Sequence, residues 1–260
     1  MKRGMKIKYG FGEDLIFENN FMRIAKSSHK IKIPKNLDQD LAYLSGYHLG
    51  DGYLEDFNKS NKNRGKSSYE ITYADKNIQQ TNLINFIIKN KFAHELKIFK
   101  RPLVNSWIAK TNCKVLHWFL TKKLKLPMGY RNNIRIQKWI FSNKQFLSSF
   151  LSGFFDAEGD VGSFIIKGRN GKKYGKIRIQ LTQKDKNFLL RVKSVLQDKY
   201  NIKSVIYKKS KQDTYVLKID ARNSVDLFRE KIDFRNTVKK DKLRRLSKEI
   251  VYKQPRKIKI

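Results

Sequence analysis

The chain contains two versions of one nine-residue segment, Leu44-Ser-Gly-Tyr-His-Leu-Gly-Asp-Gly52 and Leu151-Ser-Gly-Phe-Phe-Asp-Ala-Glu-Gly159. Each version closes a stretch with the apolar spacing of a helix, and the glycine after its acidic residue is a common helix stop. Capping-box-like pairs predict where the two helices begin, at Asn36-x-x-Gln39 and at Ser142-x-x-Gln145. Two such helices in one chain predict a duplicated folding unit.

The residues after each helix change to a period of two, which is typical of a strand. The clearest case is 174–182, where apolar Ile177 and Ile179 alternate with polar residues such as Arg178. We align the first-half segment 69–75 with 179–185 position by position. This alignment makes Glu70 the counterpart of Gln180.

The composition is strongly basic, with 58 Lys+Arg against 23 Asp+Glu and a formal net charge of +35. Nucleic acid is a better partner for this charge than a membrane, because the basic residues run through the whole chain and no apolar stretch is long enough to span a bilayer. One cysteine, Cys113, and four histidines exclude an internal disulfide and a four-ligand Cys/His zinc cluster, so a metal would need oxygen ligands. The N-terminus lacks the apolar core of a secretory signal. We therefore expect an intracellular protein, in the cytoplasm of a prokaryote or in an organelle matrix.

Each half is predicted to contain a helix, two strands, a helix, two strands and a helix. This order predicts an α+β fold of two pseudo-symmetric repeats. We expect an N-terminal extension over 1–35, a first repeat over 36–125, a linker over 126–141, a second repeat over 142–232 and a basic tail over 233–260. The tail is equally compatible with a solvated helix and with a contact to a nucleic-acid backbone.

Small residues recur at four-residue spacing on each motif helix: Gly46 with Gly50, and Gly153 with Ala157. Helix faces without side chains can approach closely, so the sequence predicts that the two motif helices pack against each other. The acids at their ends, Asp51 and Glu158, would then lie side by side and repel each other. A hard divalent cation such as Mg²⁺ would offset this repulsion, and it suits phosphodiester hydrolysis.

The two segments, together with the approach Trp139-Ile-Phe-Ser-Asn143, resemble the LAGLIDADG homing endonucleases over about residues 35–232. The resemblance implies αββαββα repeats, antiparallel β saddles that bind double-stranded DNA around a central pair of motif helices, and a monomer with both motifs in a single chain. It also implies a staggered double-strand break in a long target, with two or more Mg²⁺ ions, for which Mn²⁺ can substitute. The implied metal ligands are the carboxylates of Asp51 and Glu158 and the backbone carbonyls of Gly50 and Ala157.

The family also has a polar residue and a lysine near the metals, on the second and fourth strands of each repeat. By position, the resemblance implies catalytic roles for Gln180 and Lys218 in the second half. It implies the same roles for Glu70 and Lys110 in the first half.

Two motif positions depart from the family consensus. The fifth is His48 or Phe155, and the sixth is Leu49 or Asp156. We interpret His48 as a packed, hydrogen-bonded side chain rather than a catalytic base.

The polar faces of the strands are expected to contact DNA, and Arg178 is the best candidate for reading a guanine. The predicted first-half contacts are Ser68, Glu70 and Thr72, with a loop of Lys62, Arg64 and Lys66 that would bind phosphates. The predicted second-half contacts are Tyr174, Lys176, Arg178 and Gln180, with Ser163, Ile165 and Lys167 on the neighbouring strand.

Two other functions stay open on the same scaffold. One is an RNA maturase that binds intron RNA and assists splicing, and the other is a DNA-binding regulator that no longer cleaves. The presence of both motif acids favours the nuclease. The ends of the chain lack the nucleophile and the His-Asn pair that protein splicing needs, so we expect a freestanding nuclease rather than an intein. An intron-encoded gene stays open as an alternative.

Overall fold

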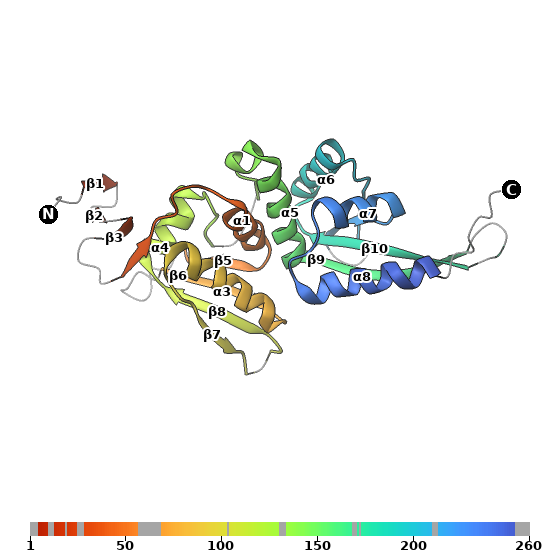
Figure 1. Cartoon of the computed structure of the whole chain (residues 1–260), viewed down its shortest axis with the longest axis horizontal. Coiled ribbons are helices and arrows are strands. Elements are labelled where there is room, and N and C mark those ends of the chain that lie inside the picture. The colour runs from red at the N-terminus through yellow and green to blue at the C-terminus, as the bar shows by residue number, and fades with distance from the viewer. Residues whose placement is uncertain are drawn as a thin grey trace. The chain divides into compact units, whose positions relative to one another are not determined.

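The computed structural model describes residues 5–9, 13–18, 20–24, 29–56, 69–102, 104–129, 134–167, 171, 173–209 and 213–252 (Figure 1). The chain divides into two compact units, Met1–Arg131 and Asn132–Ile260, and each is considered by itself. Both units combine helices with antiparallel sheets, which confirms the predicted α+β fold class. In the described residues, no helix has the length and apolar character needed to cross a membrane.

The first unit begins with a sheet that the sequence did not predict. Its strands are ordered β1-β2-β3-β4 and are β1 (Met5–Tyr9), β2 (Glu13–Glu18), β3 (Phe21–Ile24) and β4 (Lys30–Lys32). Leu15, Met22, Ile24 and Ile31 are buried in it. The described part of 1–35 is therefore a folded sheet, with contacts from β3 and β4 to helix α4.

The rest of the first unit follows the predicted order of helices and strands. Its elements are α1 (Gln39–Asp51), β5 (Gly52–Leu54), β6 (Glu70–Asp75), α3 (Ile78–Phe92), β7 (Lys97–Lys100), β8 (Trp107–Asn112), α4 (Lys114–Trp118) and the π-helical turn η1 (Phe119–Lys123). The four strands form an antiparallel sheet in the order β5-β6-β8-β7. Helix α3 contacts β6 and β8 and supplies Ile84, Ile88 and Phe92 to the core.

The second unit repeats this topology. Its elements are the 3-10 turn η2 (Lys138–Ser142), α5 (Lys144–Glu158), β9 (Gly159–Lys167), β10 (Lys173–Gln183), α6 (Lys186–Tyr200), β11 (Val205–Lys208), β12 (Tyr215–Ile219), α7 (Arg222–Lys231) and α8 (Thr237–Tyr252). The antiparallel sheet has the order β11-β12-β10-β9, which matches β7-β8-β6-β5. Helix α8 has no counterpart among the described residues of the first unit.

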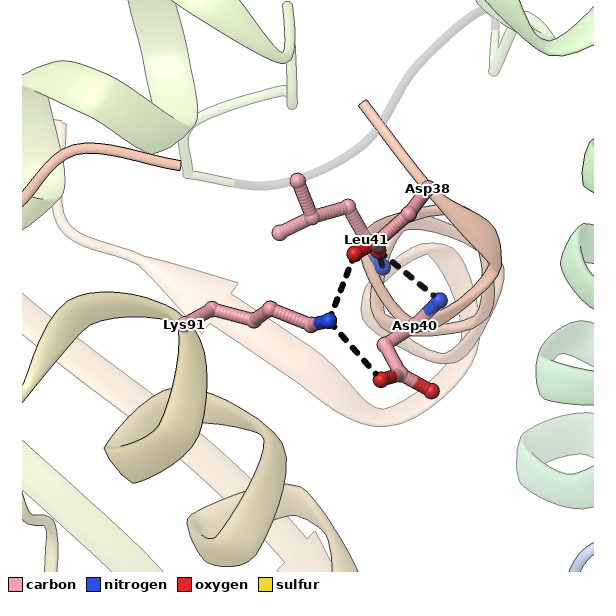
Figure 2. Close-up of polar contacts among 4 residues, drawn as sticks. All are labelled: Asp38, Asp40, Leu41 and Lys91. Carbon is pink, nitrogen blue, oxygen red and sulfur yellow. Dashed lines mark hydrogen bonds and ion pairs between the residues drawn. The ribbon is translucent and has the colours of Figure 1, made fainter. Parts of the chain in front are cut away.

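The two motif helices begin later than the sequence predicted. Asp38 caps α1, where its carboxylate accepts hydrogen bonds from the backbone N–H groups of Asp40 (3.1 Å) and Leu41 (3.0 Å), and Lys91 Nζ lies 2.5 Å from the same side chain (Figure 2). Asn143 caps α5 by accepting from the N–H of Gln145 at 2.7 Å. The predicted cap Ser142 instead ends the preceding 3-10 turn and donates to the Trp139 carbonyl. The capping-box prediction was therefore wrong at both helices.

The glycines after the motif acids do end the helices, as predicted, but not through a left-handed conformation. Gly52 and Gly159 have extended backbones with φ of −92° and −87°. A Cβ at Gly52 would lie 2.3 Å from His48 Nδ1, and one at Gly159 would lie 2.3 Å from the Phe155 carbonyl oxygen. Glycine is required at both positions because the chain passes directly from helix to strand there. A Cβ would collide with the last helical turn.

The strand register changes the alignment of the two halves. Gly52 pairs with Tyr73, whereas Gly159 pairs with Leu181, so counterparts on β6 and β10 lie 108 positions apart, as Tyr73 and Leu181 do. Gln180 therefore corresponds to Thr72, and the predicted counterpart Glu70 corresponds to Arg178. The sequence alignment had matched Asp75 to Asp185, but Asp75 still belongs to β6, and Asn77 is the residue that caps α3 as Asp185 caps α6.

Candidate active site and nucleic-acid surface

Glu158 is the last residue of α5, and a glutamine holds its carboxylate. Gln183, at the end of β10, donates from Nε2 to Glu158 Oε1 at 3.3 Å. The Gln183 Oε1 atom accepts from the backbone N–H of Lys184 at 2.9 Å. Because this second bond uses the amide oxygen, the amide nitrogen must face Glu158. Gln183 thus orients the acid, a contact that sequence reasoning missed.

Asp51 is the last residue of α1, and its surroundings are more acidic. Asp75, the counterpart of Gln183, accepts a hydrogen bond from the buried Tyr47 hydroxyl at 2.9 Å. Burial, together with the charges of Asp75 and Asp51, raises the pKa of Tyr47 well above its ordinary value. Tyr47 therefore stays protonated and donates to Asp75. The end of β6 thus adds a second carboxylate near the first motif acid.

The oxygen chemistry of these residues fits a hard cation. Among the described residues, no group of three His, Cys, Asp or Glu side chains could hold a metal ion by itself. Each motif helix instead offers one carboxylate, Asp51 or Glu158, directly after the backbone carbonyl of Gly50 or Ala157. Oxygen donors of this kind suit Mg²⁺, which also keeps several waters.

The first-unit sheet brings three of the predicted site residues together. Thr72 and Lys110 are cross-strand partners on β6 and β8. Lys110 Nζ lies 2.6 Å from Glu70 Oε2, and the Thr72 hydroxyl donates to Glu70 Oε1 at 2.8 Å. Glu70 therefore neutralises the predicted catalytic lysine instead of standing in the position of Gln180.

The second-unit sheet has a related pair. Gln180 and Lys218 are cross-strand partners on β10 and β12. Lys218 Nζ lies 3.0 Å from Asp220 Oδ2, and both side chains are largely buried, at 24% exposure each. Each unit thus pairs a polar residue with a lysine in the same ladder position, and a different carboxylate holds each lysine.

The β9–β10 hairpin separates the predicted DNA contacts onto two sides. Partners in an antiparallel ladder lie on the same side, and alternate residues lie on opposite sides. We call the side that carries Asp160, Arg178 and Gln180 the polar side, and the side that carries Val161 and Ile179 the core side. Tyr174 and Lys176 lie on the polar side, as predicted.

The prediction for the neighbouring strand was wrong about the side. Ser163 pairs with Ile177, so Ser163, Ile165 and Lys167 lie on the core side. The polar side of β9 carries Gly162, Phe164 and Ile166 instead. The error arose because β9 begins at Gly159 without an intervening loop, and this sets the phase of the alternation. The predicted contacts Lys62, Arg64, Lys66 and Ser68 lie outside the described residues.

The motif positions that depart from the consensus have structural roles. His48 is fully buried, with Nε2 at 3.3 Å from the Pro127 carbonyl oxygen, which confirms the packed interpretation. Asp156 is also fully buried, and its Oδ2 accepts from the backbone N–H groups of Arg235 and Asn236 at 3.0 and 2.9 Å. Gly46 and Gly153 are buried within α1 and α5. The close helix contact expected at Gly46, Gly50, Gly153 and Ala157 stays a prediction.

In the second unit, residues 145–233 match the sequence profile of the LAGLIDADG-like domain. Over 75% to 84% of its length the chain has the fold of LAGLIDADG homing endonucleases, which confirms the resemblance seen in the sequence. The solved structure of I-DmoI with DNA and Mn matches with a TM-score of 0.52 and 21% identity, covering 76% of this chain and 97% of that one. I-LtrWI bound to target DNA matches with a TM-score of 0.57 and 13% identity, covering 84% of this chain and 92% of that one.

Two curated proteins of Methanocaldococcus jannaschii are also similar in sequence. A glutamine–fructose-6-phosphate aminotransferase is 25% identical over 244 residues, which cover 92% of this chain and 20% of that protein. A probable translation initiation factor IF-2 is 24% identical over 246 residues, which cover 90% of this chain and 18% of that protein. The chain thus spans about a fifth of the length of these relatives.

Proposed function

We propose that the protein is a site-specific homing endonuclease that makes a staggered double-strand break in a long DNA target. The observation that carries this proposal is the repeated arrangement in the two units. Each motif helix ends on an acid, Asp51 or Glu158, and leads directly into a sheet in which a polar residue pairs with a lysine. The formal net charge of +35 supports DNA as the partner, and the similar structures of I-DmoI and I-LtrWI hold DNA.

Asp51 and Glu158, with the carbonyls of Gly50 and Ala157, would hold divalent cations. Bound Mg²⁺ would polarise the scissile phosphate and lower the pKa of an attacking water, and Mn²⁺ would substitute. Structures of I-DmoI have been solved with Mn and with Ca, which is consistent with this assignment. Gln183 keeps the Glu158 carboxylate aimed by donating to it, as a ligand-orienting residue does in metal sites.

The sheet residues would bind and position the phosphate backbone. Gln180 can donate from its amide, and Lys218 can place a positive charge beside phosphate oxygens. Both lysines have a carboxylate partner, Glu70 for Lys110 and Asp220 for Lys218, so they do not distinguish the halves. The halves differ in charge near the motif acids, because the first unit has Asp75 where the second has Gln183. We therefore expect the two strands to be cut at unequal rates.

The sequence relatives support a homing function. Two proteins whose names denote unrelated activities both match about nine-tenths of this chain over about a fifth of their own length. A segment that occurs within unrelated proteins is the expected product of a mobile gene. We further propose that the protein acts as a monomer inside the cell, since one chain supplies both motif acids.

The test is cleavage of a randomised duplex library with Mg²⁺, followed by sequencing of the ends. We expect a defined site with staggered ends, and no cleavage by Asp51→Asn or Glu158→Gln. The control is Asp213→Asn, which removes a carboxylate that is 88% exposed in a loop and should leave cleavage unchanged. Binding of DNA without any cleavage by the intact protein would favour a regulator, and splicing-dependent binding of intron RNA would favour a maturase.

A further inference from the structure

Helix α8 packs on the β9–β10 hairpin of its own unit. It contacts both strands, and Figure 1 shows α8 along β9 and β10, with α6 and α7 on the other side of these strands in that view. Leu243 is fully buried and Leu246 is 8% exposed, so one face of α8 is covered. Lys242 Nζ on the same face lies 3.5 Å from Asp160 Oδ1. Asp160 belongs to the polar side of the hairpin.

The burial pattern of β9 also indicates which side α8 covers. At the start of the strand, Val161 on the core side is buried while Asp160 is exposed. From Gly162 onward the pattern reverses, and Phe164 is more covered than its core-side neighbour Ile165, which is 71% exposed. The core side is thus open along the outer half of the hairpin. The polar side, on which α8 lies, is covered in part, since Phe164 is half-buried while Lys176 is exposed.

Arg178, the predicted reader of a guanine, lies on the same side as Phe164. Its guanidinium carbon is 4.1 Å from the centroid of the Phe164 ring, and its Nε is buried without a hydrogen-bond partner among the described residues. An arginine that reads a guanine needs its guanidinium N–H groups exposed in the major groove. With Nε buried and the guanidinium stacked on Phe164, Arg178 does not present all of its N–H groups for a base contact in this arrangement.

The start of α8 is held at the end of the motif helix α5. Asp156 binds the backbone of Arg235 and Asn236, and Lys239 Nζ donates to the carbonyls of Phe155 (3.3 Å) and Asp156. Two outward arginines of α8 have acidic neighbours within the helix, since Arg244 lies 3.9 Å from Asp241 and Arg245 lies 3.9 Å from Glu249. The contacts of Asp156 and Lys239 thus fix the start of the helix to α5.

We infer that α8 and DNA compete for the polar side of the β9–β10 hairpin. In the structure α8 occupies that surface, and DNA binding displaces the helix while Asp156 keeps its start attached to α5. The inference rests on the proposed function, which requires the same surface for DNA. Docking of α8 would lower the apparent affinity for DNA by the fraction of molecules in which the surface is open.

The test compares two changes in the same helix of the full chain. Leu243→Ala combined with Leu246→Ala removes the apolar contact and leaves all charges in place, whereas Val238→Ala changes a residue that is 58% exposed. We expect the double variant to bind a long mixed-sequence duplex roughly tenfold more tightly than the intact protein, and Val238→Ala to bind as the intact protein does. Truncation of α8 is less suitable, because the helix carries six basic and two acidic residues.

A second measurement does not depend on how the variant folds. In the intact protein, the backbone amides of 237–252 should exchange with solvent faster when the duplex is bound. Slower exchange there, or equal affinity of a folded double variant, would overturn the inference while leaving the proposed function in place. If the intact protein fails to bind and the double variant binds, α8 covers the surface fully. If neither binds, both proposals fail.

Discussion

Replacing Gly159 with alanine tests the junction between the second motif helix and its strand. A Cβ there would lie 2.3 Å from the Phe155 carbonyl oxygen and 3.1 Å from its carbon, and real Cβ contacts are essentially never shorter than 3.0 Å. The obstacle is backbone in the last turn of α5, so relief requires the helix end to move. Overpacking of this kind costs about 1 to 3 kcal/mol.

Gly162→Ala is the matched control, because it makes the same change in the same strand. A Cβ at Gly162 would meet nothing within 4 Å, so alanine there should stabilise the fold by about 0.4 to 1 kcal/mol through the unfolded state. The two variants should therefore differ in free energy of unfolding by about 1.4 to 4 kcal/mol. For a chain of this size, this corresponds to a difference of about 3 to 16 °C in Tm.

Urea unfolding followed by circular dichroism, together with thermal melting, measures this difference. Equal midpoints for the two variants, with unchanged urea dependence, would show that the end of α5 is not as close to β9 as the structure has it. Cleavage by Gly159→Ala should fall with stability, because a displaced helix end also displaces Glu158.

Three further predictions concern metal binding, the salt dependence of DNA binding and the pH dependence of stability. Gln183→Leu removes the hydrogen bond to Glu158 and should weaken Mg²⁺ binding roughly tenfold. Calorimetry measures the Mg²⁺ affinity, and the cleavage rate is measured beside it. Unchanged Mg²⁺ affinity would exclude an orienting role for Gln183. The affinity for duplex DNA should fall steeply and linearly on a log–log plot against salt, and a flat response in fluorescence anisotropy would contradict binding through phosphates. Burial lowers the pKa of His117, and the hydrogen bond to the Glu55 carbonyl raises it by less. The folded protein therefore favours neutral His117, and the stability that this neutral side chain contributes should be complete above about pH 6.5 and decrease as the pH falls. Urea titrations at pH 7 and pH 5 should show this loss, and His117→Gln should reduce it.

The features that the sequence predicted correctly are local ones. The helix ends at Asp51 and Glu158 follow from an acid followed by glycine, and strand β10 follows from its alternation of apolar and polar residues. The helix starts were less certain, because Asn36, Asp38 and Ser142 are all suitable capping residues, and only the actual chain path selects among them. The N-terminal sheet was missed because its strands are only three to six residues long, although Met5–Tyr9 does alternate between apolar and charged residues.

The sequence by itself determined the class of fold, the repetition and the two motif acids, because helix stops and residue periodicity act within a few positions of the chain. The tertiary structure decided which residues stand opposite one another. It paired Gln180 with Lys218 and Thr72 with Lys110, and it put Ser163 on the core side, because ladder register depends on hydrogen bonds between segments far apart in sequence. It also assigned Asp156 to the anchoring of α8, since a buried carboxylate takes whichever N–H groups the fold brings to it.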